Sequence, residues 1–294
     1  MTTQWHEVGA GVFQRRYEPC DVTVTAIVGS AGVAVVDTRC SLAEAQEMKK
    51  DIARFASVPV RWVVNTHSHL DHTWGNIAFA APHHSPPAQI WAHESVPAAL
   101  TPDDPAVDFF LDTFTDRGPA WQDKVDRLEI VRPTHLVERT SVIDLGDRTM
   151  ELRWTGRAHT AGDLWAVVPD ADVVVAGDLI EEAGPPIWGP DSFPFEWPRT
   201  LDAAGAFLGA GTTVIPGHGA PVDADFVRKQ RDLIASVAEQ IRALHTAGVP
   251  LEEAPSAGTW PMPESRTTHA IARGYAALDR HTEPTPSLST EGPR

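Results

Sequence analysis

Residues 65–76 read NTHSHLDHTWGN, a stretch that places His67, His69, Asp71 and His72 within six consecutive positions. In an extended segment, side chains two residues apart point the same way, so His67 and His69 can present their imidazoles to one point. Asp71 and His72 are adjacent, and a turn of the chain directs them to a second point nearby. The stretch therefore predicts one short loop that holds two cations.

Three more residues of metal-binding types stand at the ends of apolar runs. They are His159 in GRAHTAGD, Asp178 after VVVAG and His218 in VIPGHG. Each alone is typical of an ordinary turn residue. Their shared position is more informative, because parallel strands of one sheet deliver their carboxyl ends to the same edge. We therefore expect all three to lie beside the histidine loop.

The composition favours a globular protein and disfavours nucleic acid as its partner. The chain has 294 residues, and 24 lysines and arginines against 40 aspartates and glutamates give a net charge of −16. This charge opposes binding to nucleic acid or to an anionic membrane surface. Two cysteines, Cys20 and Cys40, are too few for a disulfide scaffold and fit a reducing compartment. With no signal-peptide pattern and no apolar run of about 18 residues, we expect a cytoplasmic location.

The apolar pattern predicts many short strands and a few helices. Alternating or β-branched runs bounded by turn residues predict strands at 8–14, 22–29, 32–38, 60–66, 89–94, 141–146, 149–156, 164–169, 172–178 and 212–219. Helical spacing of apolar residues predicts helices at 41–56, 200–209, 223–247 and 264–280, with short helices and loops over 100–134.

Taken together, the motifs resemble those of the metallo-β-lactamase-fold hydrolases. The similarity covers about residues 8–225. In order, it runs through the VVDT strand with Asp37, the H-x-H-x-D-H loop, His159, the A-G-D with Asp178 and the P-G-H-G with His218. The ordered set makes the resemblance specific.

The resemblance implies an α/β fold, a four-layer αβ/βα sandwich of two mixed β-sheets flanked by helices. The alternation of predicted strands and helices agrees with it. It implies a catalytic domain over 1–225 and C-terminal helices over 226–280 packed on the same domain. Residues 281–294 are polar and rich in proline, and we expect them to form a disordered tail.

The resemblance also implies a site for two metal ions. The ligands of the first ion are His67, His69 and His159. Those of the second are Asp71, His72 and His218. Asp178 bridges both ions, and Asp37 orients the loop from behind.

Five neutral imidazoles and two carboxylates carry −2 against about +4 from two divalent ions, so the loaded site attracts hydroxide. Asp71 is also the candidate catalytic residue, because its carboxylate can accept or relay a proton. We predict a binuclear metal-dependent hydrolase that uses metal-bound hydroxide on an ester, thioester or lactone of a small, partly apolar molecule. Zinc is the favoured metal, with iron and manganese as alternatives.

Asp178 separates the chain from the antibiotic hydrolases that gave the family its name, because their zinc sites lack a bridging aspartate. A β-lactamase also needs a cationic anchor for its substrate, and no lysine lies between Lys124 and Lys229. The aspartate resembles the thioesterase, lactonase and phosphodiesterase branches, of which hydroxyacylglutathione hydrolase is a familiar member. That enzyme's usual glycine-histidine is replaced by Gly162-Asp163, so glutathione is not the expected substrate.

Aromatic residues near the predicted ligands are candidates for the wall of the substrate pocket. Those in the proline-rich stretch 181–198 are Trp188, Phe193, Phe195 and Trp197, and Trp74 stands beside the histidine loop. Each is also suited to ordinary core packing.

Three other functions remain open from the sequence. A mononuclear iron enzyme similar to persulfide dioxygenases needs two histidines and one carboxylate, which His67, His159 and Asp178 can supply. A non-catalytic metal-binding scaffold and a β-lactamase are further alternatives. We expect the hydrolase to bind a small-molecule substrate, and neither nucleic acid nor a membrane. The sequence leaves the oligomeric state open.

Overall fold

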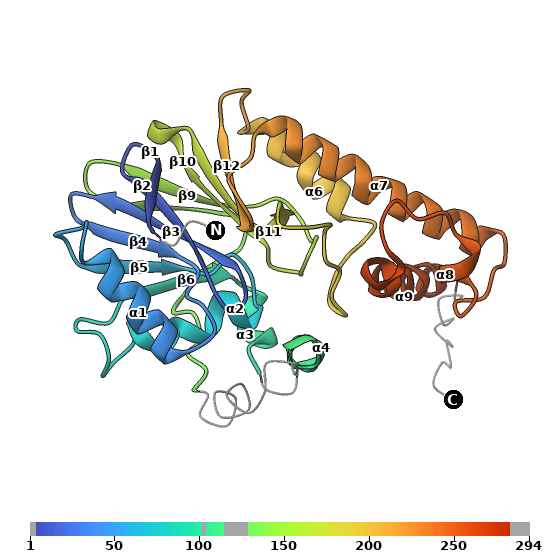
Figure 1. Ribbon diagram of the computed structural model, residues 1–294, viewed down its shortest axis with the longest axis horizontal. Helices are drawn as coiled ribbons and strands as arrows, with labels where there is room; N and C mark the ends of the chain where they lie inside the picture. Colours follow the sequence, from blue (N-terminus) through green and yellow to red (C-terminus); the bar gives the residue numbers. More distant parts are fainter. Residues whose placement is uncertain (1–3, 102–103, 115–128, 283–294) are drawn as a thin grey trace, which may run out of the picture.

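The computed structural model describes residues 4–101, 104–114 and 129–282, whose strands form two mixed sheets (Figure 1). The strands of the first sheet are β1 (His6–Gly9), β2 (Val12–Tyr17), β3 (Val22–Gly29), β4 (Gly32–Val36), β5 (Val60–Val64), β6 (Gln89–His93) and β7 (His135–Val137). Those of the second are β8 (Thr140–Asp144), β9 (Thr149–Trp154), β10 (Leu164–Val168), β11 (Val173–Glu181) and β12 (Thr213–His218).

Both sheets combine parallel and antiparallel neighbours. Strands β4 to β7 run parallel to one another, as do β11 and β12, and the remaining neighbours within each sheet are antiparallel. Hydrogen bonding continues from one sheet to the other through a single residue pair, Val22 of β3 and His218 of β12. The two sheets therefore meet at the end of β12.

The helices follow local signals in the sequence. Ser41 accepts a hydrogen bond from the backbone N–H of Glu44 and so begins α1, and Asp223 does the same for α7 through Phe226. The α-helices are α1 (Leu42–Ile52), α2 (Leu70–Thr73), α3 (Val96–Ala99), α4 (Pro105–Phe114), α6 (Trp197–Ala203), α7 (Ala224–Thr246), α8 (Ala254–Ala257) and α9 (Glu264–Thr282). The 3₁₀ helices are η1 (Trp74–Phe79), η3 (Pro169–Ala171) and η4 (Ala204–Ala206).

Three apolar clusters separate four layers. One lies between the sheets and includes Ile27 of β3 and Val175 of β11. A second lies behind the first sheet and includes Met48 of α1. The third lies behind the second sheet and joins Val174 of β11 to Ile241 of α7. Because Val174 and Val175 are neighbours on one strand, they face opposite sides of it. This arrangement confirms the predicted αβ/βα sandwich.

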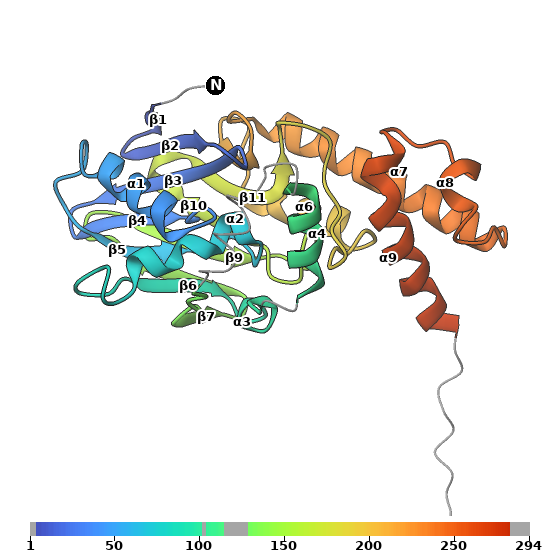
Figure 2. The same ribbon diagram turned by 60° about the horizontal axis from the view of Figure 1, so that its bottom comes forward.

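The C-terminal helices share the core of the second sheet. Ile241 of α7 and Ile271 of α9 belong to the same apolar cluster as Val174 of β11. Figures 1 and 2 show α7 extending beyond the sheets, with α8 and α9 against its far part. The domain limits proposed from the sequence remain a proposal. The predicted tail lies outside the described residues from position 283 onward.

The structure differs from the predicted elements at several points. The strand predicted at 8–14 is interrupted at Gly11, whose φ of 67° makes a tight turn between β1 and β2. Helix α6 begins at Trp197, before the predicted position 200. Strand β11 continues past the predicted end at Asp178 to Glu181, and its register with β12 shifts at Gly177, which has a φ of 55°. Strand β7 was not predicted because it has only three residues.

Among the residues that the structure describes, none of the helices has both the length and the apolar character needed to cross a bilayer.

Candidate metal centre

The seven predicted ligands meet at one edge of the sandwich although they come from both sheets. Four follow β5 or lie on α2: His67, His69, Asp71 and His72. Three come from the β9–β10 loop, from β11 and from the end of β12: His159, Asp178 and His218. The contact between β3 and β12 brings the sheets together here, so residues far apart in the sequence lie close together in space.

Buried amides hold the loop after β5 in shape. Asn65 Nδ2 donates to the carbonyl oxygen of His72 at 2.9 Å, and Asn76 Nδ2 donates to Asn65 Oδ1 at 2.8 Å. A β-carbon on Gly75 would overlap the carbonyl oxygen of Thr38. Gly75 is therefore needed for the close approach of two backbone segments. Contacts within the protein therefore hold the loop in this conformation.

The ligand atoms form two groups with Asp178 between them. Within each group, all ligand atoms lie within 4.8 Å of one another; the groups are His67, His69, His159 and Asp178, and Asp71, His72 and His218. Asp178 Oδ2 lies 3.4 Å from His159 Nε2 and 3.5 Å from His218 Nε2. Asp178 Oδ1 lies 3.3 Å from His72 Nε2. A carboxylate in this position is within reach of both groups.

Each of the five histidines is anchored through one ring nitrogen. The anchoring contacts are His67 Nδ1 to Thr66 Oγ1 at 3.0 Å, His69 Nε2 to Asp191 Oδ2 at 3.1 Å, His72 Nδ1 to Asp37 Oδ2 at 2.8 Å, His159 Nδ1 to the Ile187 carbonyl oxygen at 2.9 Å and His218 Nδ1 to the Cys20 carbonyl oxygen at 3.1 Å. A carbonyl or carboxylate oxygen only accepts, and the Thr66 hydroxyl already donates its hydrogen to Asp37 Oδ2. The anchored nitrogen of each neutral ring therefore donates, and the other nitrogen keeps its lone pair. The lone pairs are thereby directed away from the anchors.

Four central atoms are buried and make no hydrogen bond: His67 Nε2, His72 Nε2, Asp71 Oδ1 and Asp178 Oδ1. Leaving a buried polar atom unpaired costs about 1–3 kcal/mol, so four together require a partner that is not protein. Imidazole nitrogens and carboxylate oxygens are donors that suit zinc and also iron or manganese. The donor set therefore fits divalent cations.

The charges in the centre also suit cations. Burial alone would raise the pKa of Asp178, but the nearby His72 and His218 hold that pKa well below its usual value. Burial and the neighbouring His69 lower the pKa of His159 to about 4, so this imidazole is neutral at pH 7. An ionised carboxylate thus lies next to a neutral imidazole, whose Nε2 is 2.9 Å from His69 Nδ1.

Comparison with known proteins places this centre in a family. The family model described as the Metallo-beta-lactamase superfamily matches residues 17–218, a segment that contains all seven residues of the centre. The chain belongs to the metallo-beta-lactamase superfamily.

Similar curated proteins from this superfamily are thioesterases by name. The acyl-coenzyme A thioesterase MBLAC2 of Homo sapiens is 25% identical over 240 residues, which cover 73% of the chain and 81% of that protein. Its counterpart from Bos taurus is 25% identical over 236 residues, with the same coverage of 73% and 81%.

Similar solved structures show the superfamily fold. The sec-alkylsulfatase Pisa1 from Pseudomonas sp. has a TM-score of 0.74 and 18% identity, covering 97% of the chain and 52% of that structure. A metallo-beta-lactamase from Pontibacter korlensis has a TM-score of 0.58 and 16% identity, covering 79% of the chain and 98% of that structure. The chain spans about half of the length of the sulfatase.

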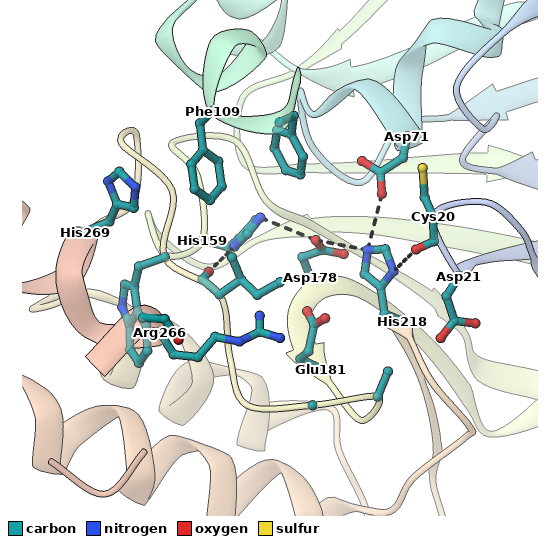
Figure 3. Close-up of a pocket in the computed structure, with 16 residues that line it drawn as sticks. Cys20, Asp21, Asp71, Phe109, His159, Asp178, Glu181, His218, Arg266 and His269 are labelled. Atoms are coloured by element: carbon teal, nitrogen blue, oxygen red, sulfur yellow. Dashed lines mark hydrogen bonds and ion pairs between the residues drawn. The ribbon is translucent and has the colours of Figure 1, made fainter. Parts of the chain in front are cut away.

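The metallo-beta-lactamase centre opens into a cavity of about 410 Å³ (Figure 3). Asp71, His159, Asp178 and His218 are among the residues that line it. The other lining residues are Cys20, Asp21, Phe109, Phe110, Glu181, Ala183, Gly184, Ile187, Trp188, Ser265, Arg266 and His269. Its size is that of an ordinary small-molecule site.

Only one of the five aromatic residues predicted for the pocket wall lines this cavity, namely Trp188. Trp74 lies in the core behind the first sheet, and Phe195 and Trp197 pack in the core behind the second. The guanidinium of Arg157 lies over Phe193, 4.5 Å from the centre of the phenyl ring, and Phe193 lines a different cavity. These four therefore do not line the cavity beside the centre, and the apolar surface of Trp74, Phe195 and Trp197 is used in packing the body of the protein.

Several residues of the site were not predicted. Asp191 fixes His69, and Glu181 lines the cavity beside the centre, where burial raises its pKa to about 8. Phe110 also lies at the site, with its ring centre 4.5 Å from that of His69. For Asp191 the sequence did hold a signal, a carboxylate within the stretch read as pocket wall.

Asp163 should give the superfamily fold a measurable pH dependence. Burial raises its pKa to about 7, although two hydrogen bonds from Thr160 act in the opposite direction. In the unfolded chain this carboxyl ionises near pH 4, whereas in the fold it stays protonated up to about pH 7. The stability that it contributes is therefore complete below about pH 4 and is lost as the pH rises from 4 to 7. At about 1.4 kcal/mol per pKa unit, Asp163→Asn, which stays neutral, should gain a few kcal/mol relative to the parent between pH 5 and 8.

The measurement is chemical denaturation of both proteins across that pH range. A difference in unfolding free energy that does not change with pH would show that Asp163 is ionised throughout.

Proposed function

We propose that the chain is a binuclear metal-dependent hydrolase that cleaves a thioester, ester or lactone of a small, partly apolar molecule. The proposal rests on Asp178, whose oxygens lie 3.3 to 3.5 Å from His72, His159 and His218 and so within reach of both ligand groups. The name of the MBLAC2 relatives favours a thioester among these bonds. Zinc in both positions is the favoured metal content.

The cavity supports a substrate with an apolar part. Phe109, Phe110, Ile187 and Trp188 supply apolar surface to its walls, and the residues of the proposed metal site lie at one side. Burying an aliphatic or aromatic group against such surface is favourable at about 25 cal/mol per Å². An acyl chain held there would place its carbonyl carbon near the centre.

The proposed ions would be held by His67, His69 and His159, by Asp71, His72 and His218, and by Asp178 between them. When bound, such ions lower the pKa of water and polarise a carbonyl group. Asp71 Oδ2 lies 3.3 Å from His218 Nε2, whereas its Oδ1 makes no hydrogen bond. Asp71 Oδ1 is therefore the oxygen that we assign to accept a proton from the attacking water. Asp191 and Asp37 keep His69 and His72 in orientation.

The test combines metal analysis with a substrate panel. The purified protein is assayed on acyl thioesters, esters, lactones and a β-lactam, before and after treatment with a chelator. We expect about two zinc ions per chain and turnover of a thioester or ester that chelation abolishes and zinc restores. Turnover that is insensitive to the chelator, or none on any member of the panel, would refute the proposal.

A second function is favoured by one observation. His67 and His159 both lie within 3.7 Å of Asp178, which is the arrangement of two histidines and one carboxylate that holds a single ferrous ion in oxygenases. One iron per chain with oxygen consumption would support this dioxygenase alternative. Two zinc ions per chain would exclude it.

A further inference from the structure

The cavity is closed by two elements that belong to different parts of the chain. Phe109 of α4 and His269 of α9 meet over it, with ring centres 4.7 Å apart. Helix α9 lies entirely beyond residues 17–218, the segment that matches the superfamily model. The side chains that α9 adds to the cavity therefore lie outside the segment that the superfamily model matches.

Arg266 is the most distinctive of these side chains. It is the only lysine or arginine among the residues found to line the cavity, in a chain with a net charge of −16. Within the described part of the chain, its guanidinium makes no hydrogen bond or ion pair with another residue. Glu181 also lines the cavity, but the two side chains do not form an ion pair.

The three aspartates of the cavity are already engaged, whereas Glu181 Oε2 is buried without a hydrogen bond. Asp21 Oδ1 accepts a hydrogen bond from Arg16 Nε at 2.8 Å. Asp71 and Asp178 lie among the histidines of the centre. Among the described residues Arg266 thus forms no ion pair, although its charge acts on the buried carboxyl of Glu181 across the cavity.

The cavity has an apolar side and a cationic side. Figure 3 shows Arg266 directed into the cavity toward Glu181, on the opposite side from Phe109, with Asp178 between them at the back. A substrate whose scissile bond lies at the centre would extend one group toward Phe109 and the other toward Arg266.

We propose that Arg266 forms an anion-binding subsite, so that the substrate carries a negatively charged group and an apolar group on opposite sides of its scissile bond. This inference rests on the proposed hydrolase function and narrows its substrate class. A guanidinium binds a carboxylate or phosphate through parallel hydrogen bonds, which are stronger than those between neutral groups. A neutral substrate would make no such bonds.

The test uses the metal-loaded full chain and matched thioesters. In the first pair, butanoate is esterified to 3-mercaptopropionate or to its neutral amide, which places the charge on the leaving group. In the second pair, the benzyl thioester carries glutarate or glutaramate, which places the charge on the acyl group. In one of the two pairs, the anionic thioester should have a kcat/KM about 10- to 100-fold higher than its neutral partner. That pair shows whether the charged group of the substrate belongs to the leaving group or to the acyl group.

Variants of Arg266 should change this preference for the anionic substrate over its neutral partner. Arg266→Gln should abolish the preference, Arg266→Lys should keep part of it, and Arg266→Glu should reverse it in favour of an ammonium analogue. The control is Arg242→Gln, because the Arg242 guanidinium lies 4.2 Å from the ring centre of Phe195 and outside the cavity. Equal loss on neutral and anionic substrates in Arg266→Gln would overturn the subsite.

Binding of thioether analogues separates the subsite from the reaction. The alkyl thioethers of 3-mercaptopropionate and of its amide are not cleaved, and their dissociation constants are measured by calorimetry. The anionic thioether should bind about 10- to 100-fold more weakly to Arg266→Gln than to the parent, and the amide equally to both. Arg266-dependent binding without turnover of any thioester, ester or lactone of the panel would refute the hydrolase and keep the subsite. Binding that does not depend on Arg266 would overturn the subsite.

Discussion

Replacing Asp178 with alanine is expected to lower kcat/KM for a thioester or ester substrate by at least about 1000-fold. The carboxylate lies between the two groups of predicted ligands, so its loss would weaken the binding of both ions. Activation of water by such ions contributes several kcal/mol, and about 4 kcal/mol corresponds to a factor of 1000 in rate. The measurement combines kcat/KM with the number of metal ions bound per chain, and both values should fall.

Asp232→Asn is the matched control for that substitution. Asp232 is an exposed carboxylate on α7, where it pairs with Arg231, and its loss should leave activity and metal content unchanged. If Asp178→Ala retained two ions and more than about a tenth of the activity, the carboxylate would not be a shared ligand.

Asp37→Asn should have the next largest effect, through the orientation of His72. Asp37 is buried at a φ of 67° and accepts hydrogen bonds from Thr66 N, Thr66 Oγ1 and His72 Nδ1, each at 2.8 Å. Asparagine tolerates this backbone conformation, but its NH2 group must face one of the three donors. Affinity for the ion beside His72 should fall about 10- to 100-fold.

Zinc titration against a competing chelator would measure that change. We expect two binding steps in the parent and a weakened second step in Asp37→Asn, with the first step retained. A fall in unfolding free energy of about 1.5–3 kcal/mol should accompany it, because a charged hydrogen-bonded group is lost. Unchanged binding in both steps would exclude an orienting role for Asp37.

The fold was predictable where residue pattern and topology agree. The β-branched runs at 32–38 and 60–66 become β4 and β5, and the helix predicted at 223–247 is α7. The candidate metal ligands were recognisable because their side chains have few other uses when they stand together at strand ends. Composition and periodicity are enough for such features, since each is set within a short segment.

The cavity could not be predicted because it is built by long-range contacts. Phe109 and His269 are far apart in the sequence, and only the folding of α4 and α9 over the centre brings their rings together. Phe195 and Trp197 have the composition of a pocket wall but face the core behind the second sheet. An aromatic residue gives no indication of which surface it will cover until the positions of its neighbours are known.

The central claim is that seven side chains hold two ions, and anomalous diffraction from crystals of the zinc-loaded protein tests it most directly. We predict two peaks above the zinc absorption edge. The first should contact His67, His69 and His159, the second should contact Asp71, His72 and His218, and Asp178 should contact both. A single peak, or two peaks that do not share Asp178, would contradict the account.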